Sequence, residues 1–230
     1  MVRRLVVGTL KGGAATCITA SQLAIWLSLR GLGPVLAADT TADQSTYEWM
    51  MAVRAKLLEK GAGSPASRID AVDLSRGGGR RLHGLERTYA HSVVHVEPKR
   101  PDLLREMLRQ PDGGQQAVDL IIPMKPYPLD LRKLPPTLAL ARESGRASPV
   151  APRVLLVQVR VGTDHATEVP VMLDAKGIPR FETVIALKES IGYSPFTIGV
   201  DAAYADVLAE LGISAPTMPA PTRKDTTHAR

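Results

Sequence analysis

The chain has 230 residues, enough for one α/β domain with a full hydrophobic core and too few for two domains of ordinary size. Apolar residues make up 44% and charged residues 23%, and no apolar run approaches the roughly 18 residues that span a bilayer. We therefore expect no membrane span and no signal peptide, and we predict a cytoplasmic protein.

The net charge and the counts of cysteine and histidine show which kinds of binding site the chain could form. The net charge is +6 and most of the basic residues are arginines, which permits binding to nucleic acid. A single cysteine, Cys17, excludes an internal disulfide and a zinc site made of cysteines. The five histidines do not occur at ligand spacing, so we expect no metal site built from protein ligands alone.

The first predicted elements are a strand, a loop of small residues, a helix and a second strand. Residues 4–8 form a short apolar run that ends in glycine and predicts a buried strand. Residues 9–15 are a turn, and residues 16–30 carry an apolar helix face that stops at Gly31. Residues 34–38 predict a second strand, closed by Asp39. This order is the opening of a right-handed βαβ unit.

The rest of the chain continues the alternation of strands and helices. Strands are predicted at residues 69–74, 92–96, 118–122, 153–159 and 181–187, with Pro123 ending the third of these. Helices are predicted at residues 41–60, 101–109, 129–144, 163–176 and 201–211. Pro135 and Pro136 should interrupt the helix at 129–144, and Pro170 should break the one at 163–176.

Two stretches lack this pattern. Residues 75–84 are expected to form a flexible basic loop, and residues 215–230 a disordered tail. The alternation elsewhere predicts an α/β fold in which a doubly wound, mostly parallel sheet is flanked by helices. We expect one domain over residues 1–214, followed by the tail.

The loop at residues 8–17 lies between the first strand and the first helix, where backbone N–H groups and the helix dipole favour phosphate. Its Lys11-Gly12-Gly13 start resembles the deviant phosphate loop of the ParA/MinD partition and positioning ATPases, whose pattern is Lys-Gly-Gly-x-Gly-Lys-Thr-Ser/Thr. The resemblance covers roughly residues 2–212. It implies a P-loop-type fold and ATP or ADP with Mg²⁺ as the cofactor.

The resemblance gives roles to single residues of this loop. In the family the early lysine reaches the nucleotide of a partner subunit, which implies this role for Lys11 and a homodimer. Ala15, Thr16 and Cys17 replace the later glycine, the phosphate-binding lysine and the Mg²⁺-binding hydroxyl. The positions implied to contact nucleotide are Lys11, Gly12, Gly13, Ala14, Ala15, Thr16, Cys17 and Ile18. With these replacements we expect nucleotide to bind weakly or not at all.

Two further positions follow from the same resemblance. Asp39 matches the first aspartate of the family's Asp-x-Asp-Pro-Gln segment, which orients the attacking water, so Lys11 and Asp39 are the candidate catalytic residues. His95 stands where we align the aspartate of the metal-supporting motif. From the residues alone, Asp39 fits a cap after a strand equally well, and His95 fits a strand-end histidine with a hydrogen-bond partner.

The later part of the chain matches the family better than the loop does. Residues 118–131 resemble its strand, proline turn and following helix, while Val157 or Gln158 stands where the family has an asparagine near the adenine. A loop lysine and a bound metal supply much of phosphoryl-transfer catalysis. Replacement of the loop lysine and of the Mg²⁺-binding hydroxyl therefore predicts absent or very weak ATP turnover.

The segment 76–109 is rich in arginine and lysine, which suits contact with a phosphate backbone without reading of base sequence. The candidate DNA contacts are Arg76, Arg80, Arg81, Lys99 and Arg100. We therefore predict a degenerate ParA-like protein of plasmid-type DNA partition or positioning, associated with the nucleoid, that binds non-specific DNA, a centromere-binding-type partner protein, or both. Two alternatives stay open: an active partition ATPase that uses Lys11 and Asp39, and a non-enzymatic dimeric scaffold or regulator.

Overall fold

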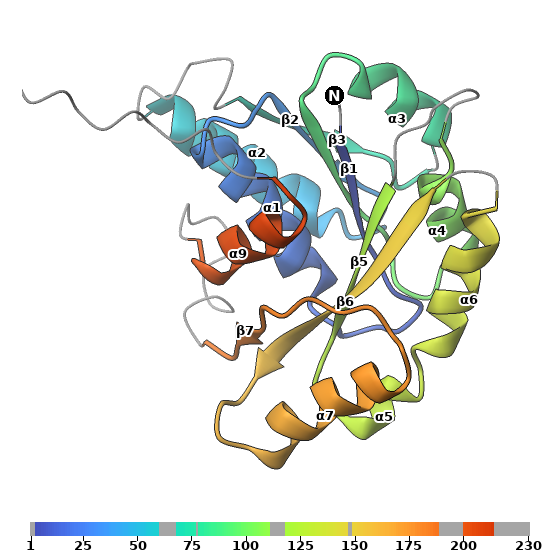
Figure 1. Ribbon diagram of the computed structural model, residues 1–230. Helices are drawn as coiled ribbons and strands as arrows, with labels where there is room; N and C mark the ends of the chain where they lie inside the picture. Colours follow the sequence, from blue (N-terminus) through green and yellow to red (C-terminus); the bar gives the residue numbers. More distant parts are fainter. Residues whose placement is uncertain are drawn as a thin grey trace, which may run out of the picture.

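The computed structural model describes residues 3–59, 68–76, 78–110, 118–146, 149–188 and 200–213. Its centre is a seven-stranded sheet made of β1 (Arg3–Val7), β2 (Val35–Asp39), β3 (Ile69–Asp73), β4 (His91–His95), β5 (Val118–Met124), β6 (Val150–Val159) and β7 (Ile185–Ala186). The strand order is β3-β2-β4-β1-β5-β6-β7, and every neighbouring pair is parallel (Figure 1). The predicted doubly wound parallel sheet is confirmed.

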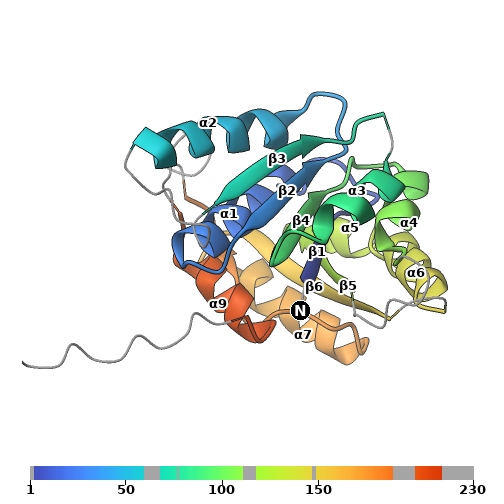
Figure 2. The same ribbon diagram turned by 90° about the horizontal axis from the view of Figure 1, so that it is seen from above.

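Helices cover both faces of the sheet (Figure 2). One face packs against α1 (Thr16–Leu29), α2 (Ser45–Glu59) and α9 (Ala203–Glu210). The other packs against α3 (Gly79–Glu86), α4 (Pro101–Leu108), α6 (Pro135–Ser144) and α7 (Asp164–Ala175), with the short α5 (Pro128–Leu131) beside them. Side chains of β1 alternate between the two cores, since Leu5 and Val7 belong to the first and Val6 to the second.

The prediction of a flexible loop at residues 75–84 was wrong, because α3 begins at Gly79. A side chain at Gly79 would displace Glu106, whose Cγ lies 2.8 Å from the Cβ position, so glycine allows the close approach of α3 to α4. Leu82 is fully buried, and Glu86 pairs with the guanidinium of Arg4. These tertiary contacts stabilise a helix that the glycine-rich sequence does not predict.

Two of the prolines predicted to end or break a strand or helix, Pro123 and Pro170, lie inside one instead. β5 continues through Pro123, because β1 pairs with β5 only as far as Ile121 and the missing N–H of Pro123 then faces no partner strand on that side. α7 also continues through Pro170, held to the core by the fully buried Val169 and Leu173. The predicted interruption between α5 and α6 is confirmed.

The predicted last strand is shorter than expected. The chain first contacts β6 around Arg180, where the N–H of Val154 donates to the carbonyl of Pro179 at 2.9 Å and the N–H of Phe181 donates to the carbonyl of Val154 at 2.9 Å. It pairs with β6 again at β7. The tail predicted at residues 215–230 lies outside the described residues, so the domain limit stays a prediction. In the part of the chain that the structure describes, no helix is both long enough and apolar enough to cross a membrane.

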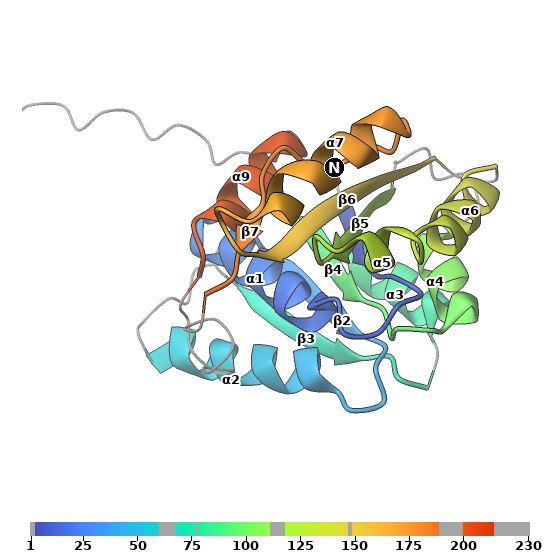
Figure 3. The ribbon, with the colours of Figure 1, turned by 90° about the horizontal axis from the view of Figure 1, so that it is seen from below.

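The carboxyl ends of the parallel strands meet at one edge of the sheet, which Figure 3 views. The connection after β1 runs to α1 on one face, whereas the connections after β4 and β5 run to α4 and α6 on the other face. Loops that diverge in this way leave a crevice beside β1. Open α/β sheets bind their ligands in such a crevice.

Candidate functional site at the phosphate loop

The loop after β1 is anchored on both sides. The N–H of Gly8 donates to the carbonyl of Ile121 at 3.1 Å. A Cβ on Gly8 would lie 3.1 Å from side-chain atoms of both Leu104 and Val96, so glycine lets the chain pass close to these two side chains. The N–H of Leu10 then donates to the hydroxyl of Thr137 in α6 at 3.1 Å. The loop therefore has a fixed path across the edge of the sheet.

Ala15 keeps the backbone shape of a phosphate loop where the family pattern has glycine. It precedes α1 in the left-handed conformation, with φ 56° and ψ 33°. That conformation costs a non-glycine residue about 1–2 kcal/mol. No side chain caps this end of α1, so the N–H groups of its first turn remain directed at the loop. The backbone conditions for holding an anion are present although the glycine is lost.

A buried polar network lies directly behind the loop, around the imidazole of His95 at the end of β4. Its Nε2 lies 3.1 Å from the hydroxyl of Thr16, and its Nδ1 lies 2.9 Å from the hydroxyl of Thr46 and 3.3 Å from the carboxylate of Asp39. Because a carboxylate only accepts, the Nδ1 edge that faces Asp39 carries a proton. The Thr46 hydroxyl also donates to Cys17 Sγ at 3.5 Å.

Asp39 is fully buried and its carboxylate is already saturated with donors. One oxygen accepts from the N–H and hydroxyl of Thr41 at 2.9 and 2.7 Å. The other accepts from the N–H groups of Thr46 and Tyr47 at 2.8 and 3.0 Å, in the first turn of α2. Burial opposes ionisation, but the hydrogen bonds and the charge of His95 together hold the pKa of Asp39 below its ordinary value. The carboxylate caps α2 and has no lone pair directed at solvent.

The network changes what the loop can do chemically. Thr16 and Cys17 stand where the pattern has its lysine and its Mg²⁺-binding hydroxyl, and both side chains are engaged with residues behind the loop. Among the residues that the structure describes, no group of three or more His, Cys, Asp or Glu side chains is placed to hold a metal. The loop backbone therefore suits an anion, while Thr16 and Cys17 supply neither a cation for the phosphates nor a metal ligand.

Lys11 turns toward its own chain. Its ammonium forms an ion pair with Asp130 in α5, where the lysine side chain is 20% exposed and the carboxylate 6%. The predicted contact with a partner's nucleotide stays a prediction. Sequence reasoning missed Asp130 and Thr46, because the residues that they contact lie far away along the chain. At the predicted adenine position, Val157 is buried and Gln158 adopts a left-handed φ of 55°.

The predicted DNA-contacting residues are all exposed and lie in two neighbouring regions of the chain. Arg76, Arg80 and Arg81 lie at the start of α3, and Lys99 and Arg100 lie before α4. The N–H of Gly79 donates to Glu106 at 2.7 Å and joins these two regions. Their charges differ in availability, because Arg100 forms a bidentate pair with Asp102 and lowers the pKa of that carboxyl to about 2.

The sequence and the structure were compared with those of known proteins. No protein-family model matches the sequence, and no curated protein matches it significantly. Solved structures do match. A Cyanothece McdA variant in complex with ATP has a TM-score of 0.70 at 16% identity, over 94% of this chain and 99% of that one. A plasmid partition protein from Borrelia burgdorferi bound to AMPPNP has a TM-score of 0.67 at 15% identity, over 92% and 98%.

The chain has a ParA/MinD-type fold. The same fold is similar to cobyrinic acid a,c-diamide synthase from Mycobacterium smegmatis with bound ADP and magnesium, at a TM-score of 0.62 and 19% identity, over 96% of this chain and 100% of that one. Identities this low show the fold alone. Because partition proteins and a synthase share the ParA/MinD-type fold, function has to be inferred from the site.

Proposed function

We propose that this chain is a degenerate ParA-like protein of DNA partition or positioning that acts by binding rather than by ATP turnover. The observation that carries the proposal is the network of His95, Thr16, Asp39 and Thr46, which fills the space behind the loop with saturated hydrogen bonds. One missing preorganised donor costs a catalytic site about 10²–10³ in rate. Several missing groups leave ATP, ADP and Mg²⁺ weakly held or unbound.

The alternative of an active ATPase needs Lys11 and Asp39 free to work. Lys11 is paired with Asp130, and all four donors to Asp39 belong to its own loop and helix. Both contacts weigh against this alternative. The exposed arginines at the start of α3 support binding to DNA phosphates, and the proposal includes a homodimer, a centromere-binding-type partner and a cytoplasmic, nucleoid-associated location.

Binding to a labelled non-specific DNA duplex, with and without Mg²⁺-ATP, tests the proposal. We expect an affinity for DNA that is the same with and without Mg²⁺-ATP. This affinity should fall by on the order of tenfold or more between 50 and 200 mM salt. Arg80→Ala with Arg81→Ala should weaken it, and the matched control, Arg142→Ala in α6, should not. DNA binding that requires Mg²⁺-ATP would contradict the proposal. Absence of DNA binding would favour the non-enzymatic dimeric scaffold.

A further inference from the structure

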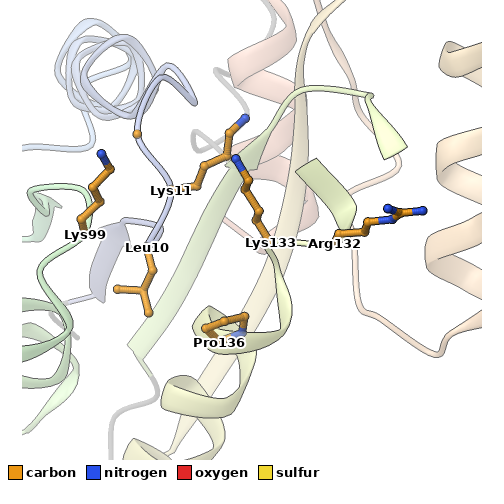
Figure 4. A pocket seen from close by; sticks show the side chains of 7 residues that line it. Leu10, Lys11, Lys99, Arg132, Lys133 and Pro136 are labelled. Atoms are coloured by element: carbon orange, nitrogen blue, oxygen red, sulfur yellow. The ribbon is translucent and has the colours of Figure 1, made fainter. Parts of the chain in front are cut away.

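A cleft of about 620 Å³ opens beside the loop, at the crevice between the ends of β1 and β5. Its volume lies within the range of small-molecule sites. Four cationic side chains and an apolar floor line it, and they come from the connections after β1, β4 and β5 and from the first turn of α6 (Figure 4). The cations are Lys11, Lys99, Arg132 and Lys133, and the floor is Leu10 and Pro136.

The charges in this cleft are largely uncompensated. None of its lining residues is acidic. Lys11 has its partner in Asp130, but within the described residues the side chains of Lys99, Arg132 and Lys133 form no ion pair and no hydrogen bond. Like charges gathered around a concave surface raise the local potential and attract an anion. An anion with three or more negative charges would neutralise the positive charges of Lys99, Arg132 and Lys133.

The walls of the cleft are held by the backbone. The N–H of Leu10 is bound to Thr137, which fixes the outer side of the loop against α6. Lys99 adopts a left-handed φ of 64°, and its Cε lies 3.7 Å from the position of a Cβ on Gly12. The N–H of Lys133 donates to the carbonyl of Asp130 at 3.0 Å. Cations placed by ordered backbone lose less freedom when a ligand binds.

The geometry points to an anion site on the outer side of the phosphate loop, away from Thr16 and Cys17, in which Lys11 of the loop together with Lys99, Arg132 and Lys133 binds a metal-free chain of linked phosphates. Arginine and lysine are the side chains that suit phosphate oxygens. The apolar floor of Leu10 and Pro136 offers a surface on which the ring of a nucleotide that carries such a chain could pack. This site uses none of Thr16, Cys17 or Asp39, so it goes beyond the proposed function.

Titration calorimetry of the full chain with inorganic tripolyphosphate and with ATP, both in EDTA at low salt, tests the site. We expect Arg132→Ala and Lys133→Ala each to weaken binding about five- to tenfold, and the double variant by at least about 20-fold. Arg142→Ala removes the same charge from an exposed position later in α6 and should change binding less than about twofold. All of these side chains are exposed, and circular dichroism with a melting curve confirms folding.

The outcomes separate the sources of the phosphate chain. Equal affinity for both ligands means that the phosphates alone are recognised, and tighter binding of ATP means that the ring contributes. No binding of either ligand, or binding that survives the double variant, would overturn the proposal. Binding of duplex DNA with the same losses, but not of tripolyphosphate, would assign the cleft to nucleic acid instead. Because EDTA removes Mg²⁺, a failure here is distinct from any result on ATP turnover.

Discussion

Replacing Asp39 with alanine should lower the free energy of unfolding of the protein, because the role of Asp39 in this structure is to stabilise the fold. The carboxylate is fully buried and accepts four hydrogen bonds, two from Thr41 and one each from the N–H groups of Thr46 and Tyr47. Removing it leaves these donors and the ring of His95 without their acceptor. The structure therefore makes Asp39 the anchor of the β2–α2 connection.

The cost follows from these contacts. Loss of a helix cap alone costs about 0.5–2 kcal/mol, and each buried donor left without its acceptor costs about 1–3 kcal/mol. A hydrogen bond to a charged group contributes about 1.5–3 kcal/mol, but contributions of neighbouring bonds do not add. We expect the free energy of unfolding of Asp39→Ala to fall by about 3–5 kcal/mol.

Urea denaturation at pH 7 measures this difference, and Asp43→Ala is the matched control. Asp43 is an exposed carboxylate in the same connection, where the hydroxyl of Thr41 and the N–H of Ser45, at 3.2 Å, lower its pKa. Because these contacts are exposed to solvent, its loss should cost less than about 1 kcal/mol. Because the folded pKa of Asp39 is lowered, its contribution is present above the unfolded pKa and disappears as the pH falls through the folded one. The gap to wild type should therefore narrow below about pH 4. A stability of Asp39→Ala within about 1 kcal/mol of wild type at pH 7 would refute this reasoning.

Three further predictions concern stability, all read by urea denaturation. Ala15→Gly should raise the free energy of unfolding by up to about 1 kcal/mol, because relief of the left-handed strain outweighs the greater freedom of the unfolded chain; a loss would contradict it. Glu86→Gln should lower it by about 3 kcal/mol, because the variant leaves the buried guanidinium of Arg4 without its counter-charge; an unchanged midpoint would count against a buried pair. Burial and the nearby Arg3 lower the pKa of His91, so the unfolded state binds its proton more readily. The free energy of unfolding should therefore fall as the pH drops through about 6.5, by at most about 1.4 kcal/mol per pH unit for this group, and His91→Gln should flatten that slope.

The sequence predicts the sheet well because buried parallel strands are continuous apolar runs. Residues 118–122 and 153–159 carry that signal without any tertiary information. It fails at α3, where Gly77-Gly78-Gly79 resembles a loop while the burial of Leu82 and the pairing of Glu86 supply the stability. It fails again at Pro123, because only the strand order reveals that one side of β5 is free there.

The site is predictable only in part, for a related reason. Lys11 and Asp39 can be located because Lys11 lies in the loop after β1 and Asp39 ends β2, and both strands end at the same edge of the sheet. Their partners, Asp130 and His95, belong to distant elements, and no local pattern joins them. Arg132 and Lys133 carry no motif at all. They become a candidate site only when three loops enclose one cleft.

Phosphate release from Mg²⁺-ATP by the purified chain tests most directly whether the loop has lost its chemistry. Lys11→Ala, prepared in the same way, controls for a co-purifying ATPase. We predict that wild type and Lys11→Ala release phosphate at the same rate, indistinguishable from the reaction without protein. A Mg²⁺-dependent turnover that wild type shows and Lys11→Ala lacks would contradict the claim and restore the active ATPase.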